Sequence, residues 1–125
     1  MNLLKFLSNI QRDNHYIPLI IFISYAVLVT GLSLKPHINL GELPYNDKLA
    51  HGISYTLFTF LGWRTTKTAS TFTRLTIGIF IYSGLIEILQ SYTGRTMSFW
   101  DLAANGTGII TSYFILRQRS SSTTE

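Results

Sequence analysis

Residues 17–34 read IPLIIFISYAVLVTGLSL and contain no charged side chain. The flanking charges are Asp13 and Lys35, so twenty-one consecutive residues carry no formal charge. A helix rises about 1.5 Å per residue, and a run of this length can cross about 30 Å of hydrocarbon. A signal peptide is the alternative, although its apolar core usually has only about 7–15 residues. The stretch therefore predicts a transmembrane helix.

Three further charge-poor stretches follow, at residues 49–63, 75–94 and 102–116. The first and the last of these are short for a membrane span. We therefore expect their helices to begin earlier and to carry Asp47, Lys48, Trp100 and Asp101 into the membrane interface. The sequence predicts an all-α protein, an integral membrane bundle of four transmembrane helices. A soluble helical bundle remains the alternative, because only the first run is both long and free of charge.

The composition limits the classes of protein that fit. Only 13% of the 125 residues are charged, whereas an ordinary soluble domain has about 25%. The chain has no cysteine, which excludes a disulfide scaffold, a thiol nucleophile and any cysteine-based metal site. We expect one interfacial N-terminal segment at 1–15, a four-helix transmembrane domain at 16–116 and a disordered cytoplasmic tail at 117–125.

The net charge of +4 could indicate nucleic-acid binding, but the basic residues lie at the ends of the apolar segments. With four spans and a cytoplasmic N-terminus, seven of the ten basic residues are cytoplasmic, in agreement with the positive-inside rule. The cytoplasmic set is Lys5, Arg12, Arg64, Lys67, Arg74, Arg117 and Arg119, and the outer set is Lys35, Lys48 and Arg95. The predicted topology thus explains the net positive charge of the chain. We expect both termini in the cytoplasm, the lipid bilayer as the main partner, and no nucleic acid.

Each of the last three predicted spans carries polar residues at helical spacing. These stripes are Asp47, His51, Ser54 and Tyr55 in the second span, Ser83, Glu87, Gln90 and Gly94 in the third, and Asp101, Asn105, Gly108 and Ser112 in the fourth. The second and fourth spans would run inward and the third outward. Their acidic ends should therefore reach a similar depth near the outer face and form one polar cluster, with Arg95 on the same side.

Glu87 and His51 are the candidate catalytic residues of this cluster. An acid deep in a membrane helix costs about 2.5–3.5 kcal/mol, so Glu87 should need a polar partner. The candidates at matching depth are Lys48, His51, Arg95 and Asn105. A histidine beside a carboxylate can exchange a proton near neutral pH, which suits His51 for a proton or ligand role.

Lys48, Arg95, Gln90 and Asn105 are the candidate ligand-binding residues, because basic and amide side chains can hold phosphate or carboxylate. Asp47 and Asp101 would orient the cations or cap helices, and the Ser98–Asp101 spacing matches a capping box. A cluster that only fixes helix register is the alternative for all of them. Asp47, His51, Glu87 and Asp101 have the donor atoms that can hold a divalent ion, but they match no recognised ligand motif. The sequence therefore predicts neither a metal nor a cofactor.

These motifs resemble the VanZ-like family of small bacterial membrane proteins. The matching strings are DKLAH at 47–51, EILQ at 87–90, the single Arg95, and DLAANGTG at 101–108. The resemblance covers about residues 44–114 and implies a multi-pass protein of the bacterial cytoplasmic membrane. The founding member of the family is linked to teicoplanin resistance. The resemblance implies no particular reaction, so it leaves open whether the protein is an enzyme.

Three functions fit these residues. The first is a site at the outer leaflet that binds or acts on an anionic envelope component, such as a lipid headgroup or a lipid-linked cell-wall precursor, with an effect on glycopeptide sensitivity. The second is a non-catalytic structural or interaction protein of the membrane. The third is a small proton-coupled carrier, which four short spans would support only in an oligomer.

Overall fold

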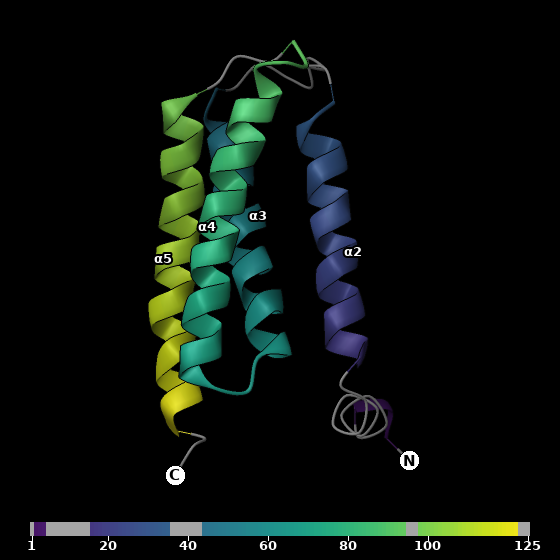
Figure 1. Cartoon of the computed structure of the whole chain (residues 1–125), viewed down its shortest axis with the longest axis vertical. Helices are drawn as coiled ribbons and strands as arrows, with labels where there is room; N and C mark the ends of the chain where they lie inside the picture. Colours follow the sequence, from purple (N-terminus) through teal and green to yellow (C-terminus); the bar gives the residue numbers. More distant parts are fainter. Residues whose placement is uncertain (1, 5–15, 36–43, 95–97, 123–125) are drawn as a thin grey trace.

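The computed structural model describes residues 2–4, 16–35, 44–94 and 98–122. Its long helices are α2 (Tyr16–Ser33), α3 (Pro44–Thr65), α4 (Ala69–Gln90) and α5 (Phe99–Ser122), and these residues form no strand. The four helices lie side by side and alternate in direction (Figure 1). The all-α prediction is therefore confirmed for the described part of the chain.

The two short apolar stretches lie in helices that begin earlier, as expected. α3 begins at Pro44 and includes Lys48, and α5 begins at Phe99 and includes Asp101. Proline suits the first turn of a helix, because the N–H that it lacks would have no partner there. α4 begins after Thr68, whose side chain accepts a hydrogen bond from the Thr71 N–H at 3.2 Å.

The ends of the helices differ from the sequence prediction. α4 ends at Gln90, before Gly94, whose φ of 86° is favourable for glycine and strained for other residues. α5 continues beyond Leu116 to Ser122, so residues 117–122 are helical although the sequence predicts a disordered tail. Arg117 and Gln118 are good helix formers and extend the helix past its apolar part. Residues 123–125 and most of the predicted interfacial segment 1–15 lie outside the described residues.

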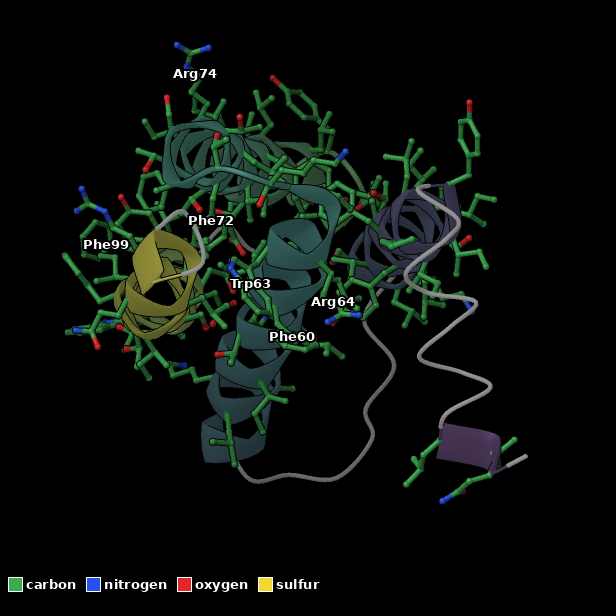
Figure 2. All side chains as sticks on the ribbon, turned by 90° about the horizontal axis from the view of Figure 1, so that it is seen from below. Phe60, Trp63, Arg64, Phe72, Arg74 and Phe99 are labelled. Atoms are coloured by element: carbon green, nitrogen blue, oxygen red, sulfur yellow. The ribbon has the colours of Figure 1, made fainter. Side chains whose placement is uncertain are left out.

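α3 is the central helix and contacts each of the other three, with its largest interface to α5 (Figure 2). An aromatic cluster joins α2, α3 and α4 around Phe58. The ring of Phe58 stacks on Tyr82 and contacts the rings of Phe22, Tyr25 and Tyr55, with centroids 5.1–5.9 Å apart. Such offset aromatic contacts add to the stabilisation from burial alone.

Two helices, α2 and α4, are long and apolar enough to cross a membrane. Only 6% of the apolar stretch in α2 and 33% of that in α4 is buried inside the bundle. Water would make such exposure of large apolar side chains unfavourable, whereas lipid would not. These two helices therefore favour a membrane protein. α3 and α5, which carry the polar stripes, do not meet the same test over the residues described.

Candidate functional site

The polar stripes of α4 and α5 point into the bundle. The polar side chains of both stripes are buried: Ser83, Glu87, Gln90, Asp101, Asn105 and Ser112. Tyr55 of the α3 stripe is also buried, and His51 is nearly so. The helical spacing thus predicts correctly which faces of α4 and α5 are buried. In the α3 stripe Ser54 is half-buried, and the side chain of Asp47 lies outside the described residues.

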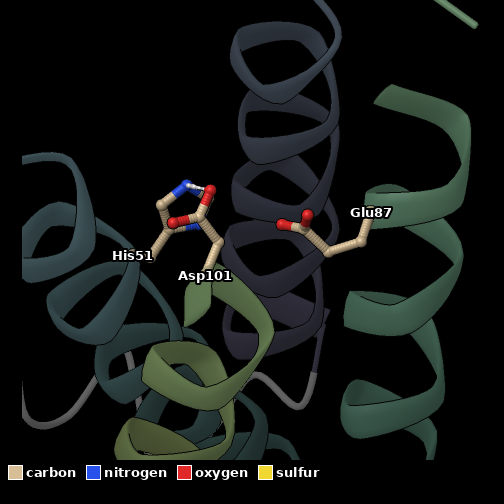
Figure 3. Close-up of side chains that lie close together, drawn as sticks. All are labelled: His51, Glu87 and Asp101. Atoms are coloured by element: carbon tan, nitrogen blue, oxygen red, sulfur yellow. Dashed lines mark ion pairs between the residues drawn. The ribbon is translucent and has the colours of Figure 1, made fainter. Parts of the chain in front are cut away.

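His51, Glu87 and Asp101 form the centre of the candidate site. They come from α3, α4 and α5 respectively, and one potential ligand atom from each lies within 4.8 Å of the other two. The carboxylate of Glu87 reaches from α4 towards the other two side chains (Figure 3). Glu87 is 2% exposed and Asp101 is 6% exposed. Two acidic groups are therefore withdrawn from solvent next to one imidazole.

Asn105 sets the orientation of the His51 ring. Its Oδ1 lies 3.1 Å from Nδ1 of His51. Because a carbonyl oxygen can only accept, Nδ1 is the donor in this hydrogen bond. The other ring nitrogen, Nε2, faces Oδ2 of Asp101 at 3.8 Å, which is longer than a hydrogen bond. The imidazole thus presents Nε2 to the Asp101 carboxylate.

The start of α5 connects Glu87 to the site. The Ser98 hydroxyl caps the helix by accepting the Asp101 N–H at 3.3 Å, as the capping-box pattern predicts. In a capping box the Asp101 carboxylate would bind the Ser98 N–H in return. Here Oε2 of Glu87 accepts that N–H instead, at 3.4 Å. The Asp101 carboxylate is consequently directed to His51 and Lys48.

Lys48 forms the solvent-exposed edge of the site. Its Nζ lies 3.9 Å from Oδ1 of Asp101, and its side chain is 43% exposed. An ion pair that is this long and this exposed contributes little to stability, because solvent screens it. Oδ1 of Asp101 is buried and has no hydrogen-bond partner among the described residues. The same holds for the hydroxyl of Tyr55, one helical turn beyond His51.

A close approach of α3 and α5 holds these side chains in place. A Cβ atom added to Gly108 would lie 2.4 Å from the carbonyl oxygen of Gly52 and 2.9 Å from Oγ1 of Thr56. Gly52 follows His51 directly, and Gly108 comes three residues after Asn105. The two backbones therefore pack without side chains between them, next to the pair His51–Asn105.

The other candidate residues have different surroundings. Gln90 is buried, but its Nε2 donates to the Ser33 carbonyl at 3.0 Å and so ties α4 to α2. Asp47 lies in the first turn of α3, as predicted, and the structure does not describe its side chain. Arg95 lies outside the described residues. Of the eight candidates, five meet at the site: Lys48, His51, Glu87, Asp101 and Asn105. We call these five residues the polar site.

Sequence reasoning misses the backbone N–H of Ser98 as a partner of Glu87. Helical spacing predicts which side chains lie near one another. The position of a backbone donor at the start of α5 depends instead on the path of the chain between α4 and α5. The one available signal is that the capping motif begins only eleven residues after Glu87. The interhelical bonds of Tyr25 to the Ser54 carbonyl and of Tyr82 to Thr30 are likewise absent from the sequence prediction.

The fold and the site define a helical protein with membrane-like apolar surfaces and a polar centre between three helices. The VanZ/LLP1 family model matches residues 2–119, so the chain belongs to this family. The resemblance drawn from the motifs at 44–114 is therefore confirmed, and the match extends over both flanking segments. No curated protein and no solved structure matches the chain.

Proposed function

We propose that the protein crosses the bacterial cytoplasmic membrane four times and binds the phosphate group of an anionic envelope component at its outer face. The observation that carries this proposal is the polar site, in which three helices bring acidic, basic and amide side chains together near one end of the bundle. Such groups are costly inside a membrane and mark functional positions there.

The distribution of charge supports an outward position for the site. Arg64 lies at the end of α3, Lys67 in the connection to α4 and Arg74 near the start of α4, whereas His51 lies near the start of α3 and Glu87 near the end of α4. The connection between α3 and α4 is at the opposite end of the bundle from the start of α3 (Figure 1). Basic residues accumulate on the cytoplasmic side of membrane proteins. The polar site would then lie near the other membrane surface, where lipid headgroups and lipid-linked cell-wall precursors are exposed.

The exposed edge of the site supports phosphate as the ligand. Lys48 is the described cation that is both half-exposed and next to the buried acids. Its ammonium group lies 3.9 Å from Oδ1 of Asp101, and a half-exposed lysine can bind phosphate as a point charge. Arg95, which follows α4, would add a second cation. His51 and Glu87 would exchange a proton with the ligand if the protein catalyses a reaction.

A charge-neutralising substitution tests the proposal. Protein in nanodiscs of zwitterionic phosphatidylcholine would be titrated with phosphatidylglycerol and, separately, with a polyprenyl phosphate. We expect Lys48→Gln to weaken binding at least about tenfold, because a hydrogen bond to a charged group is worth about 1.5–3 kcal/mol and about 1.4 kcal/mol corresponds to a factor of ten. Lys67→Gln removes the same charge at the opposite end and should bind as the wild type does.

The two titrations distinguish the sources of the phosphate. Tighter binding of phosphatidylglycerol would identify a lipid headgroup, and tighter binding of polyprenyl phosphate would identify a lipid-linked precursor. Equal weakening by Lys48→Gln and Lys67→Gln would refute a specific site. Teicoplanin sensitivity of cells that express the wild type or Lys48→Gln would then show whether the site affects glycopeptide action.

A purely structural role is the second candidate. It is supported by interhelical bonds that already use site residues, such as His51 to Asn105 and Glu87 to the Ser98 N–H. Glu87→Gln separates the two functions, because it keeps the shape and an acceptor oxygen but removes the charge. A variant that stays folded and changes the affinity for phosphate supports the binding site. A variant that unfolds supports the structural role.

A further inference from the structure

We propose that His51, Glu87 and Asp101 bind one divalent transition-metal ion, Zn²⁺ or Mn²⁺. Its role rests on the proposed function, because the ion would bridge the polar site to the phosphate of the ligand. The ion binding itself depends only on the three side chains.

The ligand atoms have suitable chemistry and spacing. An imidazole nitrogen with two carboxylates suits Zn²⁺ and Mn²⁺, and three protein ligands leave a position open for water or phosphate. Nε2 of His51 and Oδ2 of Asp101 are 3.8 Å apart. Two ligands that each lie about 2.1 Å from one ion are separated by about 3–4.2 Å. This distance is too long for a hydrogen bond but fits two ligands of a shared cation.

The surroundings of the three side chains resemble the outer shell of a metal site. A histidine ligand usually donates its second N–H to a carbonyl or carboxylate, which fixes the tautomer. His51 donates Nδ1–H to Asn105 and directs Nε2 to Asp101. Ligating carboxylates are also held by hydrogen bonds, and Oε2 of Glu87 accepts the Ser98 N–H. Both supports are in place on different helices.

The balance of charge gives an independent reason for a cation. Asp101 is more than nine-tenths buried, and its Oδ1 has no hydrogen-bond partner among the described residues. Two carboxylates this close repel one another, and buried charge is costly unless it is compensated. The described ion-pair partners of Asp101 are Lys48, which is half-exposed and 3.9 Å away, and His51, which is 3.8 Å away and charged only when protonated. One divalent ion would satisfy both acids at once.

The ion also removes an electrostatic conflict in phosphate binding. Without it, a phosphate that approaches Lys48 would meet two negative carboxylates directly behind the ammonium group. A bound divalent ion is the largest local charge in a site and reverses its sign. It would then supply an open coordination position to a phosphate oxygen, with Lys48 at the edge of the same opening.

Metal analysis of the purified full chain tests the proposal. The protein would carry no histidine tag and would be stripped with chelator in zwitterionic nanodiscs. It would then be dialysed against Zn²⁺ or Mn²⁺ and analysed for bound metal. We expect one ion per chain, and a loss of affinity of at least about tenfold in His51→Gln and in Asp101→Asn. The control His15→Gln/His37→Gln removes the other two histidines and should keep the ion.

Second measurements keep the result clear if a variant folds poorly. Asn105→Ala leaves all three ligands in place and should weaken ion binding about 10–100-fold, the usual cost of losing an outer-shell partner. Wild-type protein that binds no stoichiometric ion overturns the proposal, and so do folded His51→Gln and Asp101→Asn variants that bind as tightly as the wild type.

Phosphate titrations with and without chelator separate this inference from the proposed function. Phosphate binding that persists in folded, metal-free protein supports the proposed function and refutes the bridging ion. Ion binding without any phosphate binding refutes the proposed function and leaves the metal site in place.

Discussion

Gly108→Ala tests the close packing of α3 and α5 that holds the polar site. The new Cβ would lie 2.4 Å from the Gly52 carbonyl oxygen, whereas real Cβ atoms essentially never come closer than 3.0 Å. The obstacle is backbone, so it cannot move aside by changing a rotamer. The two helices must separate by more than half an ångström, and overpacking of this kind typically costs about 1–3 kcal/mol.

Gly84→Ala is the matched control, because a Cβ at Gly84 in α4 meets nothing within 4 Å. Both substitutions gain about 0.5–1 kcal/mol from the greater helix propensity of alanine. The difference between the two free energies of unfolding therefore isolates the steric cost, which we expect at about 1–3 kcal/mol. Unfolding in mixed micelles with increasing SDS, followed by circular dichroism, measures both values. Equal stability of the two variants would refute the close approach at Gly108.

Three further substitutions test single contacts by the same unfolding assay. Ser98→Ala should cost about 1 kcal/mol, because it removes the N-cap of α5; no loss would contradict the cap. Tyr55→Phe should be neutral or stabilising, since its buried hydroxyl has no hydrogen-bond partner among the described residues, whereas Tyr25→Phe should cost about 0.5–1.5 kcal/mol. The opposite order would contradict these assignments. Gln90→Leu should cost about 1 kcal/mol by separating α4 from α2, and an unchanged stability would contradict that tie.

Helical periodicity accounts for most of what the sequence predicts about the interior. The spacing of Asp101, Asn105 and Ser112 places them on one face of a helix, and all three are buried in α5. The early start of α3 and α5 follows from the length that a membrane span requires. Both predictions depend only on the repeat of the helix and on its rise per residue.

The distances between helices do not follow from periodicity. The sequence shows four glycines that could permit close packing, Gly78, Gly84, Gly106 and Gly108, but Gly78 and Gly84 have open space beside them. Only the rotation of α5 against α3 decides that Gly108 meets backbone. The packing of α3, α4 and α5 likewise brings His51, Glu87 and Asp101 within reach of one ion. The metal hypothesis, which the sequence disfavours for lack of a motif, therefore gains its support from tertiary structure.

Tertiary structure also determines which group the Gln90 side chain contacts. Its spacing of three residues from Glu87 places both side chains on one side of α4. α2 packs beside the end of this helix, and the Ser33 carbonyl in the last turn of α2 accepts a hydrogen bond from the Gln90 amide. Helix termini leave backbone groups that a long polar side chain can satisfy, and one sequence does not show which terminus will be adjacent.

The orientation of the polar site in the membrane is the claim on which the proposed function depends most. The chain has no cysteine, so single cysteines can be introduced without background. Ser91 and Ser70 are both exposed and lie at opposite ends of α4. Spheroplasts that express Ser91→Cys or Ser70→Cys would be treated with a membrane-impermeant maleimide, before and after permeabilisation. The account predicts that Ser91→Cys reacts in intact spheroplasts and Ser70→Cys only after permeabilisation, and the reverse pattern would contradict it.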